Sequence, residues 1–140
     1  MSNDILNAMQ ISAHGMRAQG ARIRVITENV ANAGTTGLTP GADPYTRQTI
    51  SFKNQLDREM GVHFVEVDDI GRDTKTPFEL KYLPDHPAAN EEGFVKMPNV
   101  NTMLEIMDIR EAQRSYEANL GMIEQSRTMI SRTIDLLRSV

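Results

Sequence analysis

The residues of this 140-residue chain that could carry chemistry are its histidines and the aspartates near them. His63 and His86, together with Asp68, Asp69 and Asp85, offer the ring nitrogens and carboxylates that bind zinc in many proteins. Their spacing matches no pattern of metal ligands, and the pair Asp85-His86 lies between two prolines, which is typical of a turn. The sequence therefore predicts neither a metal nor any other cofactor.

Covalent catalysis has no better support. A nucleophilic serine or threonine needs a base beside it, and no motif in the chain supplies that pair. The segment AGTTG at 33–37 is rich in glycine but lacks the lysine of a phosphate-binding loop. His14 has no acidic residue near it, so we expect it to face solvent or an interface. We predict that the protein is not an enzyme.

The composition excludes other classes of protein. A net charge of −4 gives no reason to expect a nucleic-acid partner, and the absence of cysteine excludes disulfides and thiolate metal sites. The first residues lack the basic start and continuous apolar core of a secretory signal peptide. No uncharged stretch reaches the roughly 18 apolar residues that a membrane-spanning helix needs. We expect a soluble chain that does not span a membrane and is not cleaved if it is exported.

A long helix is predicted over residues 3–33. Residues suited to cap it lie at both ends, namely Ser2, Asn3, Asp4 and Gly34. Alternate steps of four and three along this segment meet mostly apolar residues, which is the pattern of a heptad row in a coiled coil. The row consists of Ile5, Met9, Ser12, Met16, Gln19, Ile23, Ile26 and Val30.

A second long helix is predicted after Pro98, and Thr102-x-x-Glu105 has the form of a capping box at its start. The same walk of three and four residues gives a second row, called here the apolar row. It consists of Ile106, Ile109, Gln113, Tyr116, Leu120, Ile123, Arg127, Ile130, Ile134 and Leu137. A flanking row mixes small polar residues with methionine and leucine: Ala112, Ser115, Asn119, Met122, Ser126, Met129, Thr133 and Leu136.

Between the helices the sequence changes character. Residues 32–44 are rich in glycine, threonine and proline and predict a loop. Three segments rich in β-branched and aromatic residues predict strands at 45–52, 62–67 and 78–82. The segments 57–61 and 68–77 are expected to be turns between them.

These elements predict a mainly α protein in which two long terminal helices pair as an antiparallel coiled coil around a small β-rich insert. We expect three parts: residues 1–34 as the N-terminal helix, 35–97 as the loop and β insert, and 98–140 as the C-terminal helix. The second helix has apolar or small residues on more than one row, and both rows contain polar residues. A single pair of helices would leave one of these rows uncovered, so we interpret the pattern as a bundle completed by other chains.

Four segments resemble one known family. The segment ITENVANAGTTG at 26–37 resembles the Asn-Leu-Ala-Asn-Ala signature of bacterial flagellar axial proteins, which include rod, hook and hook-associated subunits. The segment RSYEANL at 114–120 resembles the Arg-x-Tyr-Glu-Ala-Asn element of their C-terminal helix. The segments at 43–52 and 83–101, DPYTRQTISF and LPDHPAANEEGFVKMPNVN, are similar to those of the proximal rod members. Departures are small: Val30 replaces the usual leucine, and LTPGAD at 38–43 lengthens the loop.

The resemblance implies a structural subunit of the flagellar rod, exported uncleaved through the flagellar type III channel and polymerised in the periplasm. Its terminal helices would form the inner layers of a hollow tube that transmits motor torque. The implied partners are other copies of the chain, other rod proteins, and the membrane ring and export apparatus at the rod base. Asn29 and Asn32 would set the end of the first helix, and the element Tyr116 to Asn119 would contact that end or a neighbouring subunit.

The residues expected to mediate assembly are the apolar members of both rows and the motif residues: Ile5, Met9, Met16, Ile23, Ile26, Asn29, Val30, Asn32, Ile106, Ile109, Tyr116, Asn119, Leu120, Ile123, Ile130, Ile134 and Leu137. Two alternatives stay open at this point. The chain could be an intracellular coiled-coil adaptor that binds partner helices, or a small metal-dependent hydrolase that uses His63 and His86.

Overall fold

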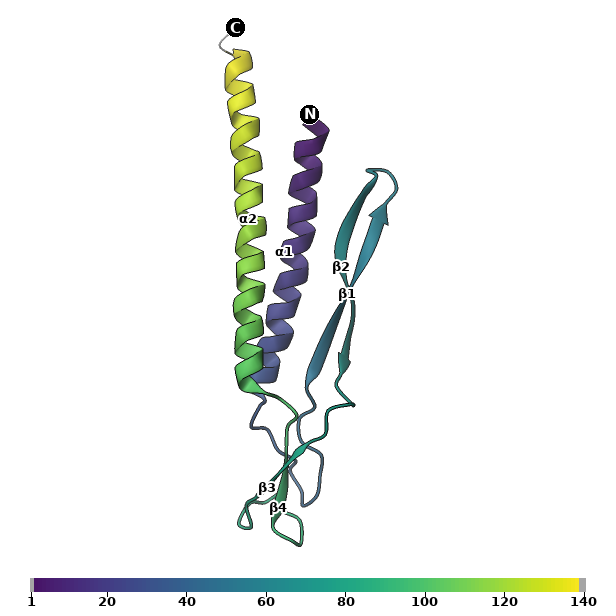
Figure 1. Ribbon diagram of the computed structural model, residues 1–140, viewed down its shortest axis with the longest axis vertical. Helices are drawn as coiled ribbons and strands as arrows, with labels where there is room; N and C mark the ends of the chain where they lie inside the picture. The colour runs from purple at the N-terminus through teal and green to yellow at the C-terminus, as the bar shows by residue number, and fades with distance from the viewer. Residues whose placement is uncertain (1, 139–140) are drawn as a thin grey trace. The chain divides into compact units, whose positions relative to one another are not determined.

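The computed structural model describes residues 2–138. It contains two helices and four strands in the order α1 (Ser2–Ala31), β1 (Gln48–Asp57), β2 (Val62–Arg72), β3 (Glu79–Tyr82), β4 (Phe94–Met97) and α2 (Thr102–Arg138) (Figure 1). About half of the chain is helical, and the strands form two sheets of two strands each. This confirms the predicted class, in which two terminal helices pack against each other around a small β insert.

The described residues form two compact units, and both helices contribute to each of them. The first unit contains residues 2–23, 51–68 and 110–138, and the second contains residues 24–50 and 69–109. The first therefore holds the N-terminal part of α1, most of α2 and the tip of the β1–β2 hairpin. The second holds the end of α1, the start of α2 and the rest of the insert.

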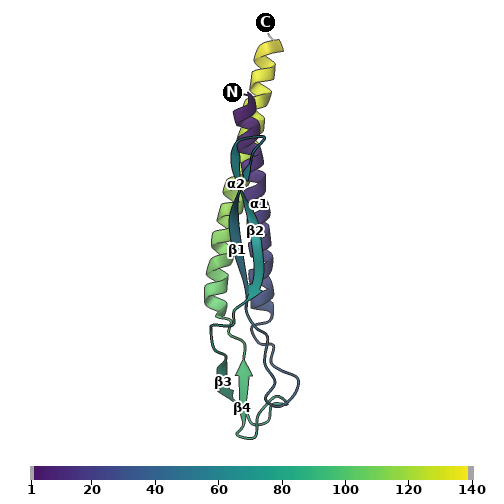
Figure 2. The ribbon, with the colours of Figure 1, turned by 90° about the vertical axis from the view of Figure 1, so that its right-hand side faces the viewer.

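In the first unit, α1 and α2 lie side by side and run in opposite directions (Figure 1). Gly15 lies against Asn119, and Nη2 of Arg22 is 3.7 Å from Oε2 of Glu111. The hairpin lies along α1 on the side away from α2 (Figures 1 and 2). Its buried Phe64 stacks on the imidazole of His14, with ring centroids 4.3 Å apart.

The helices pair through small and polar residues rather than through the predicted apolar row. Positions 112, 119 and 126 of α2, which are Ala, Asn and Ser, are spaced by seven residues, and we call them the small-residue row. Ala112 and Ser126 in this row are 0% and 1% exposed. Leu120 and Ile134 of the apolar row are 40% and 50% exposed. Leu120 and Ile134 are therefore open to solvent in the single chain, and their expected role in assembly stays a prediction.

Helical geometry explains this difference. Successive residues of an α-helix are about 100° apart, so Ile106 and Leu120, each one residue after a position of seven-residue spacing that is turned inward, point away from it. Ile109, Ile123 and Ile130 lie roughly 40–60° from the small-residue row, and they are half-buried.

Close approach of the helices at Gly15 gives a testable prediction. A Cβ atom on Gly15 would lie 2.8 Å from Nδ2 of Asn119, whose side chain is held by a 2.9 Å hydrogen bond to the carbonyl of Ser115. Gly20 has no atom within 4 Å of its Cβ position. Gly20→Ala should stabilise α1 by about 0.5–1 kcal/mol through helix propensity.

Gly15→Ala should not show this increase in stability, because Asn119 must move and give up its hydrogen bond to Ser115. Urea unfolding of the two variants measures the difference in unfolding free energy. Adding Asn119→Ala to Gly15→Ala should restore the gain. Equal stabilisation by both single substitutions would contradict the close contact.

In the second unit, β3 and β4 pair antiparallel, with Tyr82 opposite Phe94 and Lys81 opposite Val95. Val95 is 0% exposed, while the rings of Tyr82 and Phe94 meet edge to face on the other side of the sheet. Gly93 has a φ of 83°, and a side chain there would collide with Tyr82 at 2.8 Å. A glycine is therefore required at the turn that leads into β4.

The insert differs from the predicted strands at several points. The predicted turn at 57–61 is confirmed, because Asp57 Oδ1 accepts hydrogen bonds from the amides of Glu59 and Met60. The predicted strand at 45–52 instead occupies Gln48–Asp57, and the predicted turn at 68–77 begins only after β2 ends at Arg72. Strand β4 was not predicted. It is four residues long and contains a lysine, so its strand character comes from pairing with β3 rather than from its own composition.

Candidate assembly surface and its polar junction

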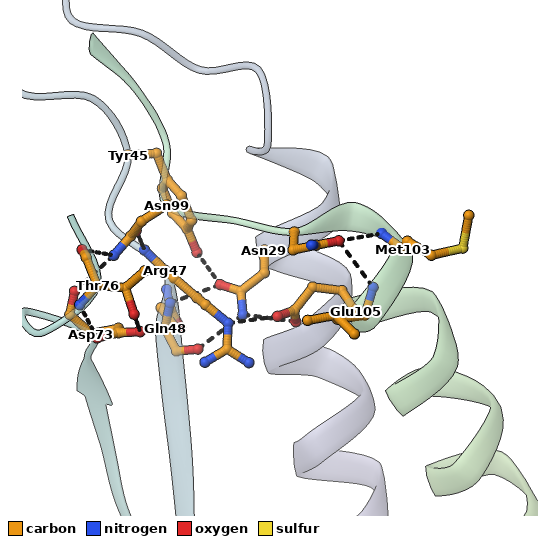
Figure 3. A network of polar contacts seen from close by, with 11 residues as sticks. Asn29, Tyr45, Arg47, Gln48, Asp73, Thr76, Asn99, Met103 and Glu105 are labelled. Atoms are coloured by element: carbon orange, nitrogen blue, oxygen red, sulfur yellow. Dashed lines mark hydrogen bonds and ion pairs between the residues drawn. The ribbon is translucent and has the colours of Figure 1, made fainter. Parts of the chain in front are cut away.

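A buried asparagine joins three segments of the second unit. Asn29 on α1 is 1% exposed, and its Nδ2 donates to the carbonyl of Gln48 (2.9 Å) and to Oε2 of Glu105 (3.1 Å). Its Oδ1 accepts from the amide of Gln48 (2.8 Å) and from the hydroxyl of Tyr45 (2.9 Å). An asparagine side chain has two donors and room for two acceptor contacts, so every hydrogen-bonding position of Asn29 is used (Figure 3). One side chain thereby links α1, β1 and α2.

A buried carboxylate completes this junction. Glu105 on α2 is 1% exposed, and its Oε1 lies 2.6 Å from Nε of Arg47, just before β1. The other oxygen accepts from Asn29. A buried charge is tolerated only when it is paired and hydrogen-bonded, and both conditions are met here. The arrangement fixes the insert to both helices and leaves no reactive group unpaired.

A second asparagine connects the junction to the β insert. Asn99 Oδ1 accepts from the amide of Arg47 (2.8 Å), and its Nδ2 donates to the carbonyls of Asp73 (2.9 Å) and Thr76 (3.0 Å). The amide of Asp73 donates in turn to the carbonyl of Arg47 (2.8 Å). These bonds hold the end of β2 against the start of β1 (Figure 3).

The start of α2 differs from the predicted capping box. Asn101 is the N-cap residue, since its Oδ1 accepts from the amides of Met103 (3.1 Å) and Leu104 (3.3 Å). Thr102 is the first helical residue, and the carboxylate of Glu105 points into the junction instead of back to the cap. The ion pair with Arg47 decides the orientation of the Glu105 side chain. The capping-box pattern covers only four neighbouring residues, so it gave no information about this distant partner.

Tyr45 is held as a neutral donor. Burial raises the pKa of its phenol, and the negative charges of Glu28 and Glu105 raise it further. The hydroxyl therefore keeps its proton at neutral pH and donates it to Asn29.

Asp73 makes the stability of this unit depend on pH. Hydrogen bonds from the hydroxyl and amide of Thr76 and from the amide of Lys75 lower the pKa of Asp73. Because the pKa is depressed in the folded state, the ionised carboxylate stabilises the fold above the ordinary aspartate pKa of about 3.9. That contribution is lost as the pH falls through the folded-state pKa.

We expect Asp73→Asn to be less stable than the parent near neutral pH and to approach it as the pH falls below the ordinary aspartate pKa and through the lower folded-state pKa of Asp73. Thermal unfolding measured across this pH range tests the prediction. Asp85→Asn, at an exposed aspartate of the following loop, is the control. A stability difference that stays constant with pH would contradict the role of the Asp73 charge.

The two motif asparagines of α1 have different roles. Asn32 lies at the helix end, where its Nδ2 donates to the carbonyl of Glu28 (2.9 Å) and its Oδ1 accepts from Thr35 (3.1 Å). Asn29 does not cap its helix but forms the junction. Gly34, predicted as the C-cap, does not adopt the left-handed conformation; among the glycines within 2–138, only Gly41, Gly61 and Gly93 do.

The predicted assembly residues fall into three groups by exposure. Ile26 and Asn29 are buried. The half-buried ones are Ile5, Met9, Met16, Ile23, Val30, Asn32, Ile109, Asn119, Ile123 and Ile130. The exposed ones all lie on α2 and are Ile106, Tyr116, Leu120, Ile134 and Leu137. A candidate assembly surface is therefore present on α2.

In the element Tyr116 to Asn119, the structure shows one contact with α1. Asn119 packs against Gly15, near the middle of that helix. Tyr116 is 36% exposed and is available to another chain.

The three histidines have separate surroundings. His14 stacks on Phe64, His63 is exposed, and Nδ1 of His86 accepts from the amide of Ala88 (3.1 Å) within a turn. Within residues 2–138, no three histidine or acidic side chains are grouped as metal ligands would be. Over the same residues, neither helix has a stretch apolar enough to span a membrane.

Sequence reasoning did not identify most of the junction, although a signal was present. Tyr45, Arg47, Gln48 and Asn99 lie inside the segments that carried the family resemblance, at 43–52 and 83–101. Asn29 lies in the motif at 26–37, whereas Glu105 lies outside the motifs. The motifs were interpreted as marks of a family, whereas the structure shows that their polar residues hold three segments together.

Comparison with known proteins gives a consistent result. Residues 91–136 match the family model described as "Flagellar basal body rod FlgEFG protein C-terminal". The chain is 48% identical over 132 residues to flagellar basal-body rod protein FlgC of Agrobacterium fabrum, with 94% of each chain covered. Identity to the FlgC protein of Borreliella burgdorferi is 34% over 152 residues, covering 96% and 98% of the two chains. Identity to that of Salmonella typhimurium is 32% over 133 residues, covering 94% and 97%.

Proposed function

The chain belongs to the FlgC family of flagellar basal-body rod proteins and is a structural subunit of the rod, and we propose that it polymerises through its terminal helices. As a member of this family it is not an enzyme, so the hydrolase alternative is wrong, and it assembles with other rod proteins in the flagellar basal body. In the proposal, residues 1–34 and 98–140 form the assembly core, and residues 35–97 form an insert that the junction fixes to it.

One observation carries the proposal. The small-residue row is buried at Ala112 and Ser126, and this leaves many large apolar side chains of α2 in contact with solvent. The exposed residues along α2 include Met103, Ile106, Met107, Tyr116, Leu120, Met122, Met129, Ile134 and Leu137. Soluble monomers rarely expose so many large apolar side chains along one helix, and such surfaces usually mark protein interfaces. Methionine-rich faces also adapt to unlike partners, which suits a rod built from several proteins.

The internal pairing of the helices is expected to be weak. Small residues bury little apolar area, and Oε1 of Gln19 is buried with no hydrogen-bond partner among the described residues. An unpaired buried polar atom costs about 1–3 kcal/mol. A pair of this kind opens readily, which would suit passage through a narrow export channel, and neighbouring subunits would then stabilise it.

The finer parts of the proposal follow the family resemblance. The chain would be exported without cleavage, assemble in the periplasm, and contact copies of itself and the membrane ring and export apparatus at the rod base. Mass spectrometry of isolated basal bodies tests this. An N-terminal peptide that begins at Met1 or Ser2 would support uncleaved export. Finding the chain only in the cytosolic fraction would favour the intracellular adaptor.

Leu120→Asp tests the assembly surface. The side chain is 40% exposed, so the substitution should leave the helix content of the monomer unchanged. In the rod, it would bury an unpaired carboxylate against a neighbouring subunit, which costs several kcal/mol and should abolish assembly. The readouts are circular dichroism of the purified chain, its amount in basal bodies, and swimming motility.

Gln125→Asp adds the same charge to an exposed polar position of α2 and serves as the control. It should retain motility. Normal motility of Leu120→Asp would show that this surface of α2 does not face a neighbour.

A further inference from the structure

The C-terminal end of α2 extends past the start of α1. Within the first unit, Gly15 lies against Asn119 and Arg22 lies 3.7 Å from Glu111, and these two contacts fix the antiparallel register of the helices there to within a residue. Continued along the first unit, this register places Ser2, where α1 begins, opposite residue 132. The exposed fractions of the side chains agree with this register. Ile123 and Ile130 are half-buried, whereas Ile134 is 50% and Leu137 is 75% exposed. The interface between the helices thus continues along α2 as an open apolar surface.

The opposite end of α2 carries a hollow of about 460 Å³. Its apolar lining comes from Pro77, Pro98, Val100 and Met103, and Glu79 contributes an exposed carboxylate. The volume lies within the roughly 300–1,000 Å³ range of pockets that hold small ligands, so two aliphatic side chains can enter it. The side chain of Met103 is 68% exposed.

We propose that the C-terminal end of α2, with Ile134, Leu137 and Arg138, docks into the hollow at the start of α2 of a second copy of this chain. The inference rests on the proposed function and names the partner surface within it.

Three properties of the two ends are complementary. Ile134 and Leu137 would cover Met103 and Val100, which removes apolar surface of both copies from water. Arg138, in the last turn, would meet the carboxylate of Glu79. The negative end of one helix dipole would face the positive end of the next, an arrangement favoured at helix termini.

The geometry also determines the kind of assembly. Contact between two different ends of the same chain is heterologous, so each added copy exposes a new end for the next. A symmetric contact between two C-terminal ends would close after one dimer and leave both hollows empty. The head-to-tail contact is therefore the one that can build a rod.

Engineered cysteines test the contact directly, because the chain contains none of its own. Two differently tagged full-length variants, Leu137→Cys and Met103→Cys, would be expressed together, and isolated basal bodies would be oxidised. The matched control replaces Met103→Cys with Leu104→Cys, whose parent side chain is 59% exposed but does not line the hollow. Disulfides need Cα atoms within about 7 Å, so the yield of mixed dimer should be roughly tenfold higher for Met103→Cys than for the control.

A charge exchange gives a second readout. Arg138→Glu should lower the yield of mixed dimer about two- to fivefold, as expected for a partly exposed ion pair. Glu79→Arg in the partner variant should restore it. Equal yields from Met103→Cys and Leu104→Cys, or a predominance of dimers between two Leu137→Cys chains, would overturn the proposal.

The same preparation of basal bodies distinguishes a failure of the head-to-tail docking from a failure of the rod function. If the tagged chains are present in basal bodies of motile cells but do not cross-link, head-to-tail docking is wrong and the rod function stands. If they are absent from basal bodies of motile cells, the rod assignment of the chain itself fails.

Discussion

Asn29→Ala is expected to lower the free energy of unfolding by about 3–5 kcal/mol, a large part of the stability of a small domain. The substitution removes all four hydrogen bonds of a side chain that is 1% exposed. It leaves the amide and carbonyl of Gln48 without their side-chain partner and takes one donor from the buried carboxylate of Glu105. Urea unfolding followed by circular dichroism measures the loss.

Asn32→Ala is the matched control, three residues further along the same motif. Asn32 makes exposed, local hydrogen bonds, so its removal should cost about 1 kcal/mol or less. If both alanine variants lose the same stability, the junction does not have the central role assigned to it. Asn29→Asp should also be strongly destabilised, since it keeps the shape of the side chain but places a second carboxylate beside Glu105.

Arg47→Met is expected to destabilise the chain by about 3 kcal/mol, because it leaves the carboxylate of Glu105 buried without its cation. The figure is at the lower end for a broken buried ion pair, since the Arg47 side chain is 30% exposed and water can enter in its place. The double variant Arg47→Met with Glu105→Leu should recover much of the loss, because it removes both charges and leaves apolar side chains of similar size.

Lys96→Met provides the comparison. Lys96 and Asp43 are also close, at 2.7 Å, but their side chains are 39% and 70% exposed. Water solvates both charges there, so the substitution should change stability by less than about 1 kcal/mol. A loss at Lys96 as large as that at Arg47 would mean that burial does not set the strength of these pairs.

The family motifs now have a physical interpretation. Asn29, Arg47 and Asn99 come from three different motifs of the sequence, and the fold brings them into one hydrogen-bonded junction. The fourth motif contains Asn119, which lies against Gly15 where the helices approach closely. These residues join segments within the chain, whereas large apolar residues of α2 remain available to other chains. This division of roles fits a subunit whose fold and assembly use different rows of the same helix.

Local patterns were sufficient for part of this description. Helical periodicity predicted both long helices to within a few residues of their observed ends, because α-helical hydrogen bonds join residues close in sequence. The turn at 57–61 was likewise predictable from its aspartate and glycine. The motifs were sufficient to indicate the family.

Only the tertiary structure decided which face of each helix is used and what the polar residues do. The register between α1 and α2 places the small-residue row at the interface, and no periodicity within one helix contains that register. Strand β4 exists through its pairing with β3, and Glu105 turns away from its helix cap because Arg47 lies 58 positions earlier in the chain but 2.6 Å away in space. Such contacts depend on where distant segments meet. The sequence alone therefore determined the two helices, whereas long-range packing determined strand β4 and the surfaces that the helices leave exposed.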